Sequence, residues 1–275
     1  MSDMDGKEAF NYLQKELTKK FDRRQAAQMS KIYFEDIFNV RFPSQKKQIS
    51  ESEWHVMKED IRRLFNGYPL VYITGKTNFY GLDLMINDRV LIPRPETEQL
   101  VDWLVEDCKG HGGLSLLDIG TGSGCIAVAL AKHLTNCEVS AIDVSAEALD
   151  LASMNADYYT VDVRFIHGSA LDPDFKNRTA NFDILVSNPP YIDKGDPMVS
   201  NSTRLYEPDL ALFAGEKGLL FYKRFAEVLR EGQILYLEIN EFLSQEIRHL
   251  FLDKGWSCDM RKDLQGKDRM LKVYR

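Results

Sequence analysis

Hydrophobic residues in the first 75 positions recur every three or four residues, the spacing of one face of an α-helix. Three such stripes lie at 10–17, 26–37 and 54–64. Ser50 and Glu53 precede the third stripe in the order of a capping box, which begins a helix. We therefore expect a small helical bundle whose packed faces carry Phe10, Leu13, Leu17, Ala26, Met29, Tyr33, Ile37, Trp54, Met57, Ile61 and Leu64.

The pattern changes after residue 75. Apolar positions alternate on both sides of Asn87 and Asp88, which predicts a β-hairpin that turns at this pair. From about residue 97, short apolar runs alternate with helical stripes, as in a doubly wound α/β sheet. The sequence therefore predicts a helical bundle at 1–75, a linking β-hairpin at 76–96 and an α/β domain at 97–275.

A glycine-rich turn follows the short apolar run at 116–119 and leads into an alanine-rich helix. Gly120, Gly122 and Gly124 can adopt positive φ and let a ligand lie against bare backbone. A dinucleotide fingerprint would place its third glycine at position 125, where this chain has Cys125, and no P-loop lysine follows. The spacing favours a nucleoside ligand without a pyrophosphate, although a plain strand-to-helix turn would also use these glycines.

Asp143 ends the next predicted strand, about 20 residues beyond the glycines, where an acidic residue meets ribose hydroxyls in nucleotide-binding sheets. Asp143 could instead cap the helix that begins near Ser145. Both roles could hold together, and binding of ribose is the favoured interpretation.

The segment 187–192, Ser-Asn-Pro-Pro-Tyr-Ile, follows a predicted strand and should lie where open α/β sheets bind ligands. Its two prolines remove two N–H donors and leave carbonyl acceptors. The side-chain oxygen of Asn188 and a neighbouring carbonyl can accept both hydrogens of a planar –NH2 group, and the Tyr191 ring can pack on its face. The segment therefore suits an amide or an exocyclic amine, with an ordinary proline-rich turn as the alternative.

Together, the glycine loop, the acidic strand end and Asn-Pro-Pro-Tyr resemble S-adenosylmethionine-dependent methyltransferases that act on planar nitrogen. With the runs at 90–98 and 206–208 and the pair Gly218-Leu219, the chain resembles the PrmC/HemK family over nearly its whole length. The resemblance implies methylation of the glutamine amide in the Gly-Gly-Gln loop of class 1 peptide chain release factors. It also implies a mostly parallel seven-stranded sheet, a last antiparallel strand at 269–274 at or near an edge, and a substrate-docking role for the bundle.

The resemblance carries roles onto individual residues. It implies that the substrate amide is held by Asn188, Pro189 and Tyr191, which would be catalytic. It implies that Pro190, Arg94 and Glu96 also belong to the substrate-binding site, where Arg94 and Glu96 would shape the pocket over the sulfonium and the substrate. It implies that S-adenosylmethionine is held by Gly120, Thr121, Gly122, Ser123, Gly124, Asp143, Ser169, Ala170 and Asn188. Arg94 and Glu96 could equally form a rigid linker before a helix.

The residue that holds the adenine stays open. Many related enzymes have a carboxylate where this chain has Ser169, and Asp172 is nearby but shifted.

Composition changes this picture little. The net charge of −7 argues mildly against a nucleic-acid substrate, because proteins that hold polyanions usually carry a basic patch. A nucleic-acid adenine methyltransferase remains the alternative, and a catalytically silent adaptor is a second one. The four cysteines and five histidines form no metal-binding motif, so no metal is expected. Scattered cysteines, with neither a signal peptide nor a membrane span in view, are typical of a cytoplasmic protein.

Overall fold

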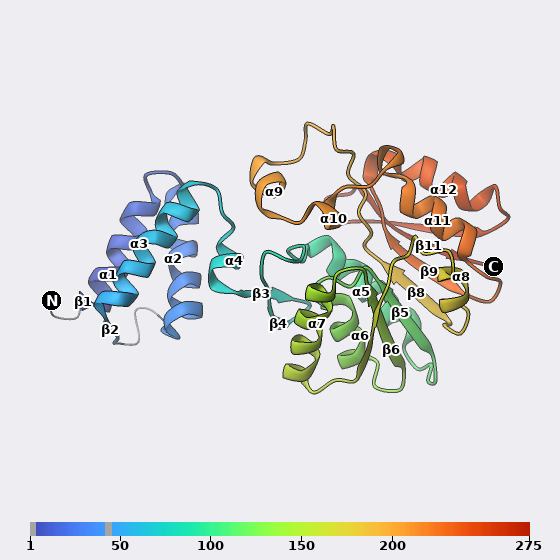
Figure 1. The fold of residues 1–275 in the computed structure, drawn as a ribbon, viewed down its shortest axis with the longest axis horizontal. Coiled ribbons are helices and arrows are strands. Elements are labelled where there is room, and N and C mark those ends of the chain that lie inside the picture. Colours follow the sequence, from blue (N-terminus) through green and yellow to red (C-terminus); the bar gives the residue numbers. More distant parts are fainter. Residues whose placement is uncertain (1–3, 42–45) are drawn as a thin grey trace. The chain divides into compact units, whose positions relative to one another are not determined.

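The computed structural model describes residues 4–41 and 46–275, which separate into two units. One unit contains the residues up to Lys76 together with Ser200–Tyr206, and the other contains Thr77–Val199 and Glu207–Arg275. In Figure 1 the helices of the first unit are mostly blue, and the sheet of the second runs from green to red. In the part of the chain that is described, no helix is long and apolar enough to cross a membrane.

The first unit is the expected helical bundle. Its helices are α1 (Gly6–Leu17), α2 (Arg23–Phe38), α3 (Glu51–Phe65) and α4 (Leu70–Thr74), and β1 (Met4–Asp5) pairs with β2 (Gln48–Ile49). The capping box of Ser50 and Glu53 is present at the start of α3. The stripe predicted on α2 is partly wrong, because Ile37 is 38% exposed while Phe34 and Phe38 are buried.

The short helix α9 (Asn201–Tyr206) groups with this bundle, although the sequence placed it in the α/β domain. Ser202 Oγ donates to the carbonyl of Gly67 at 2.6 Å, and the Tyr206 hydroxyl donates to the carbonyl of Asn66 at 3.0 Å. These contacts join residues more than a hundred positions apart, so no local pattern could indicate them.

The linking hairpin turns earlier than expected. Its strands are β3 (Lys76–Phe79) and β4 (Leu82–Met85), so the turn lies at Tyr80-Gly81 and the turn predicted at Asn87-Asp88 is wrong. Tyr80 and Gly81 have φ values of 49° and 77°, and a two-residue hairpin loop with positive φ at both positions matches the right-handed twist of its strands.

The second unit contains a seven-stranded sheet in the order β10-β11-β9-β8-β5-β6-β7. Its strands are β5 (Ser115–Ile119), β6 (Glu138–Asp143), β7 (Val163–His167), β8 (Ile184–Ser187), β9 (Ile234–Glu238), β10 (Ser257–Lys262) and β11 (Asp268–Tyr274). The first five are parallel, while β11 and the edge strand β10 are antiparallel to their neighbours. The predicted doubly wound sheet is confirmed, including the antiparallel last strand next to an edge.

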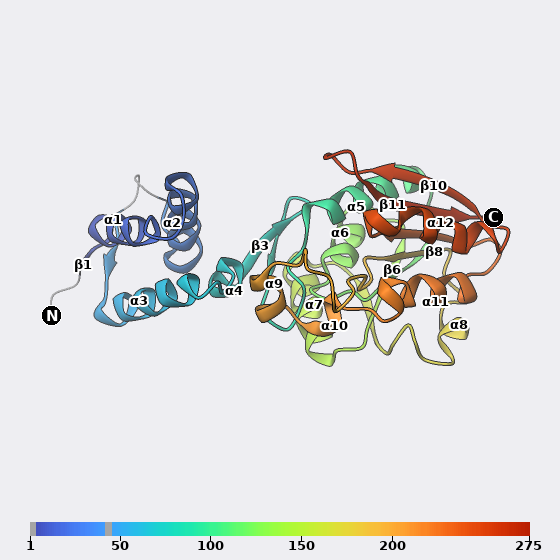
Figure 2. The same ribbon diagram turned by 90° about the horizontal axis from the view of Figure 1, so that it is seen from above.

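Helices cover both faces of the sheet, as Figure 2 shows from above. One face packs against α5 (Pro95–Cys108), α6 (Cys125–His133) and α7 (Ala146–Tyr159). The other packs against α8 (Phe175–Arg178), α11 (Leu220–Val228) and α12 (Ser244–Leu252). Three shorter helices, α10 (Asp209–Leu212), η1 (Glu216–Gly218) and η2 (Glu241–Leu243), lie in the connections.

The strand order places the ends of β5 and β8 side by side. The chain moves outward from β5 to β6 and β7, then returns to the other side of β5 for β8 and β9. Open α/β sheets bind ligands at such a reversal, beyond the carboxyl ends of the strands. The glycine loop follows β5 and the Asn-Pro-Pro-Tyr segment follows β8, so both lie at this position.

Two glycines of the loop after β5 differ in their surroundings. Gly124 has a φ of 81°, and a Cβ added there would lie 2.9 Å from Cβ of Ala152 on α7. Gly120 has a φ of 76°, but a Cβ added there would meet no atom within 4 Å. Gly124 therefore allows close packing of the loop on α7, whereas Gly120 leaves open space.

We predict that Gly124→Ala destabilises the protein more than Gly120→Ala. Both variants place a Cβ at positive φ, which costs about 1–2 kcal/mol. Only Gly124→Ala also overpacks the contact with Ala152, which adds about 1–3 kcal/mol. Urea unfolding without ligand measures both values, and equal free energies of unfolding would contradict the packing role.

Candidate functional site

A cavity of about 280 Å³ lies at the carboxyl edge of the sheet. All of its lining residues belong to the second unit. They come from the ends of β5, β6 and β8, from the segments after β4, β5, β6, β7 and β8, from the starts of α7 and α10, and from α11. Of the residues predicted from sequence, those that line it are Gly120, Gly122, Asp143, Ser169, Ala170, Asn188, Pro189 and Pro190.

The glycine loop presents bare backbone to this cavity. Gly120 and Gly122 both have positive φ, and a Cβ at either position would meet no atom within 4 Å. Thr121 does not line the cavity, because its hydroxyl donates to Asp118 Oδ2 at 2.6 Å beneath the loop. Ser123 and Gly124 are also absent from the lining, so these three residues shape the loop.

Asp118, which sequence reasoning did not single out, supports the loop from below. Its Oδ2 also accepts the N–H of Ala127 at 3.2 Å, while Oδ1 is buried without a partner among the described residues. Burial raises the pKa of Asp118 to about 7, although the hydrogen bonds oppose this shift. The available signal was an acidic residue in an apolar strand directly before the glycines.

Asp143 lines the cavity and also holds two loops. Its Oδ2 accepts the N–H of Gly122 at 2.8 Å, and its Oδ1 accepts the N–H of Ser145 at 2.9 Å. The N-cap of α7 is Ser145 itself, whose Oγ accepts the N–H of Ala148 at 3.2 Å. A carboxylate has about four acceptor positions, so Asp143 retains capacity for ligand hydroxyls.

The loop after β7 brings Ser169 and Ala170 to the cavity but leaves Asp172 outside the lining. Asp172 Oδ2 accepts the N–H of Ser169 at 2.9 Å, so its carboxylate stabilises the turn. The carboxylates among the lining residues of the described chain are Asp88, Asp143 and Glu147. None of them comes from the loop in which related enzymes often carry an acidic residue.

Within residues 4–41 and 46–275, no group of three or more His, Cys, Asp or Glu side chains could hold a metal ion.

Asn188 stands at the end of β8, next to the cavity. Ser187 Oγ donates to the carbonyl of Ile119 at 2.7 Å and so ties this strand end to β5. Asn188 Nδ2 donates to Thr97 Oγ1 at 3.0 Å, and no described residue donates to its Oδ1. The Asn188 side chain thus has one end engaged and an acceptor oxygen available for a ligand.

Glu238 lies behind the Asn-Pro-Pro-Tyr segment and is 1% exposed. Its Oε2 accepts the Thr97 hydroxyl at 2.6 Å, and its Oε1 accepts the Tyr191 hydroxyl at 3.1 Å. Burial raises the pKa of Glu238, and Thr97 and Arg269 oppose this shift. Tyr191 therefore meets Glu238 and is not among the cavity-lining residues, and burial raises the pKa of its phenol.

Arg94 and Glu96 also lie outside the cavity lining. Arg94 forms an ion pair with the buried Glu207, which also accepts the N–H of Ile92 at 3.2 Å. Glu96 lies in the first turn of α5, where a negative charge favours the helix N-terminus. These positions match the linker interpretation of the segment before α5.

Apolar residues that sequence reasoning missed form a large part of the wall. Among them are Val90, Leu91, Leu210, Phe221 and Phe225. Leu210 is 74% exposed, so part of this apolar surface faces solvent. The cavity therefore combines bare backbone, carboxylates that include Asp143, the Asn188 amide and apolar side chains, which suits a ligand with a sugar and a planar ring.

Residues 96–207 match the family model of the methyltransferase small domain. A release factor glutamine methyltransferase of Flavobacterium psychrophilum is 43% identical over 215 residues, which cover 74% of this chain and 75% of the relative. One from Bacillus subtilis is 41% identical over 239 residues and covers 83% of each chain.

Solved structures match the fold. A methyltransferase from Pyrococcus furiosus has a TM-score of 0.51 at 21% identity and covers 79% of this chain and 97% of its own. A 16S rRNA methyltransferase from T. thermophilus, solved with AdoMet and guanosine, has the same TM-score and identity, with coverage of 73% and 49%. The resemblance found in the sequence is confirmed: the chain belongs to the release factor glutamine methyltransferase family, whose members depend on S-adenosylmethionine.

Proposed function

We propose that this enzyme transfers the methyl group of S-adenosylmethionine to the glutamine side chain in the Gly-Gly-Gln loop of class 1 peptide chain release factors. The observation that carries the proposal is Asn188, which lines the cavity with Nδ2 engaged by Thr97 and Oδ1 left to accept a hydrogen bond. Family membership supports the same substrate. Release factors act in translation, so we infer that the reaction takes place in the cytoplasm.

The cavity fits S-adenosylmethionine. Gly120 and Gly122 offer a cradle that a Cβ would fill, and Asp143 offers a carboxylate to ribose hydroxyls. Ser169 and Ala170 would line the adenine side. The bound cofactor supplies a methyl group that its sulfonium already activates.

Asn188 and Pro189 would hold the substrate amide. An amide nitrogen is a poor nucleophile because its lone pair is delocalised, so alignment matters most and can contribute about 7–11 kcal/mol. Asn188 Oδ1 and the Pro189 carbonyl would accept the two amide hydrogens. These hydrogen bonds strengthen as positive charge develops on nitrogen, which stabilises the transition state selectively. The product can release its proton afterwards, so the mechanism needs no general base.

Tyr191 would pack on the planar amide, with its ring held by the hydrogen bond to Glu238. An aromatic face packed on a planar amide adds contact area and needs no further hydrogen-bond donor. Pro190 next to it keeps the segment stiff, because proline fixes φ.

The helical unit would dock the release factor. It has a hydrophobic core of its own, and the cavity is lined by the second unit. A glutamine amide is a small target, so specificity must come from contacts remote from the reacting nitrogen. We therefore assign docking of the release factor body to residues 1–75.

Labelled S-adenosylmethionine tests this function with three substrates: a release factor, its loop Gln→Ala variant and adenine-containing DNA. The proposal expects label only in the unaltered release factor. Label in DNA would instead support the adenine methyltransferase. Binding of the cofactor without transfer to any substrate would support the silent adaptor.

Asp143→Ala should weaken binding of S-adenosylmethionine by about 1.5–3 kcal/mol, because a charge-assisted hydrogen bond to the ribose is lost. Calorimetry measures the dissociation constant, which should rise by roughly 10- to 150-fold. Asp150→Ala removes the same charge from an exposed position on α7 and should leave binding unchanged. Binding of NAD in place of the sulfur nucleosides would contradict the cofactor assignment.

Asn188→Ala should lower kcat by roughly 100-fold or more, on the scale of a lost transition-state hydrogen bond. The affinity for S-adenosylmethionine should change far less. Asn188→Asp keeps an acceptor oxygen but loses the amide and adds charge. Comparing its kcat with that of Asn188→Ala separates the loss of the acceptor from the loss of the amide. Near wild-type turnover in Asn188→Ala would show that the segment is only a turn.

Deletion of residues 1–75 should lower kcat/KM on the intact release factor while changing activity on a short Gly-Gly-Gln peptide much less. The deletion also removes the packing partners of α9, so binding of S-adenosylmethionine is measured first to verify the fold of the sheet. Equal losses on both substrates would indicate a structural role, and full activity on the intact factor would exclude docking.

A further inference from the structure

A hydrogen-bond chain of three side chains connects Glu238 to Asn188 behind the cavity. Glu238 Oε2 accepts from Thr97 Oγ1 at 2.6 Å, and Thr97 Oγ1 accepts from Asn188 Nδ2 at 3.0 Å. Thr97 lies in the first turn of α5 and is 2% exposed, so water has little access to its hydroxyl. The three residues come from α5, β9 and the end of β8, and are brought together only by the fold.

The direction of this chain follows from counting protons. A carboxylate is an acceptor only, so the single hydroxyl proton of Thr97 is committed to Glu238. Thr97 Oγ1 can then only accept from its other neighbour, which requires the amide nitrogen of Asn188. If the Asn188 amide were rotated so that Oδ1 and Nδ2 exchanged places, Oδ1 would face the lone pair of the buried Thr97 Oγ1 and neither atom could donate. A buried polar atom left unpaired costs about 1–3 kcal/mol.

A second hydrogen bond links the same carboxylate to Tyr191, whose hydroxyl donates to Oε1 at 3.1 Å. Glu238 therefore constrains two residues of the Asn-Pro-Pro-Tyr segment: Oε1 holds Tyr191 directly, and Oε2 holds Asn188 through Thr97. Tyr222 also contacts Glu238, but its hydroxyl donates to the backbone carbonyl at 3.1 Å and not to the carboxylate.

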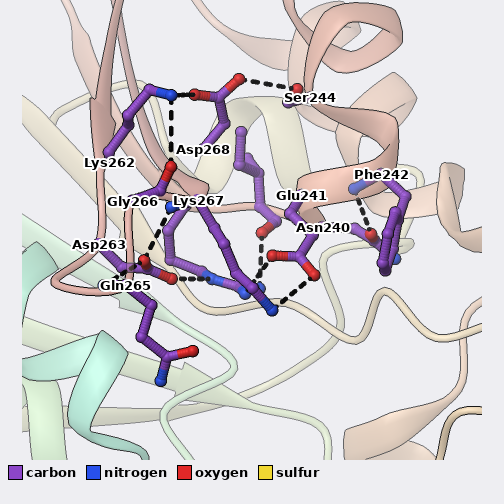
Figure 3. Close-up of polar contacts among 12 residues, drawn as sticks. Asn240, Glu241, Phe242, Ser244, Lys262, Asp263, Gln265, Gly266, Lys267 and Asp268 are labelled. Carbon is purple, nitrogen blue, oxygen red and sulfur yellow. Dashed lines mark hydrogen bonds and ion pairs between the residues drawn. The ribbon is translucent and has the colours of Figure 1, made fainter.

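Arg269 supplies the positive charge that favours the ionised carboxylate and lies on β11, the strand beside β9. Asp263, Glu241 and Lys267 meet where the β10–β11 hairpin turns (Figure 3). Arg269 bonds to Asp263 Oδ2 at 3.3 Å and to Glu241 Oε2 at 3.2 Å, while Lys267 holds the other oxygen of Glu241 at 3.0 Å. The Arg269 guanidinium is thus held by hydrogen bonds to two carboxylates, those of Asp263 and Glu241.

We propose that Glu238 is a positioning residue for methyl transfer: through the Thr97 hydroxyl it orients the Asn188 amide so that Oδ1 faces the substrate, and it holds Tyr191 directly. The inference rests on the proposed role of Asn188 in binding the substrate amide. Burying a carboxylate costs several kcal/mol unless it is well paired, so an acid placed here without a role would weaken the fold. Glu238 touches neither substrate nor cofactor in this role and acts through its two neighbours.

Thr97→Val removes the hydroxyl while keeping the shape of the side chain. At saturating S-adenosylmethionine, its single-turnover rate on the release factor should fall by about 10- to 100-fold, the scale of a misaligned reactant. Thr97→Ser restores the hydroxyl and should recover most of the rate. Tyr222→Phe removes the neighbouring hydrogen bond to the backbone of Glu238 and should leave the rate near wild type. Undiminished transfer in Thr97→Val would overturn the proposal.

A double-mutant cycle with Asn188→Ala separates positioning from general damage. If Thr97 acts through Asn188, Thr97→Val should cause little further loss once Asn188 is alanine. An equal fold-loss in both backgrounds would overturn the proposal. Glu238→Gln, whose amide can donate to Thr97 and reverse the chain, should lower the rate and combine non-additively with Thr97→Val.

An NMR measurement tests the orientation without any turnover. The side-chain amide protons of Asn188, assigned by their absence in Asn188→Ala, should exchange slowly with water in the wild type. They should exchange faster in Thr97→Val and recover in Thr97→Ser. Fast exchange in the wild type would overturn the inference. An inactive wild type with slow exchange would keep the inference about orientation and reject only the proposed substrate.

Discussion

Five parallel strands end at one edge of the sheet, and their order reverses between β5 and β8. Because the carboxyl ends of these two strands lie side by side, the loops that follow them must share one crevice. Gly120 and Asn188 reach the same cavity for this reason, although 67 positions of β-α-β connection separate them. The bond from Ser187 Oγ to the Ile119 carbonyl locks the two strand ends together. The order of the strands in the sheet therefore sets where the glycine loop lies relative to Asn188.

Each of the two functional loops has a buried acid beneath it. Asp118 accepts from Thr121 and Ala127 under the glycine loop, and Glu238 accepts from Thr97 and Tyr191 behind the Asn-Pro-Pro-Tyr segment. Burial raises the pKa of both acids, because desolvation disfavours the ionised form, and hydrogen bonds to the carboxylates oppose this shift. A buried carboxylate whose hydrogen bonds are satisfied makes its surroundings more rigid. In the proposed mechanism these are the two loops that align the methyl donor with the substrate amide, so their rigidity would favour the reaction.

The parts of this structure that were predictable are those that neighbours in sequence determine. Ser50 and Glu53 signal a helix start because both partners of the capping box lie within one turn. The hairpin turn at Tyr80-Gly81 was missed because Asn87-Asp88 offers better turn residues, and the positive φ of Tyr80 has no sequence signal. Thr97 and Glu238 were missed for a different reason. Their hydrogen bond spans 141 residues, so only the fold brings the pair together.

The Glu238 arrangement also bears on how the enzyme can act on so weak a nucleophile. Its hydrogen bonds to Thr97 and Tyr191 run between protein atoms alone, so in the proposed role they would aim the acceptor oxygen of Asn188 before substrate binds. Preorganised dipoles require no reorganisation at the moment of reaction, and this difference from water is what makes them effective. In the proposed mechanism, an amide that enters the site would meet two fixed acceptors, Asn188 Oδ1 and the Pro189 carbonyl, instead of mobile solvent. If Glu238 positions Asn188 as proposed, folding has already fixed the buried carboxylate and its donors, and this order would contribute to the rate of methyl transfer.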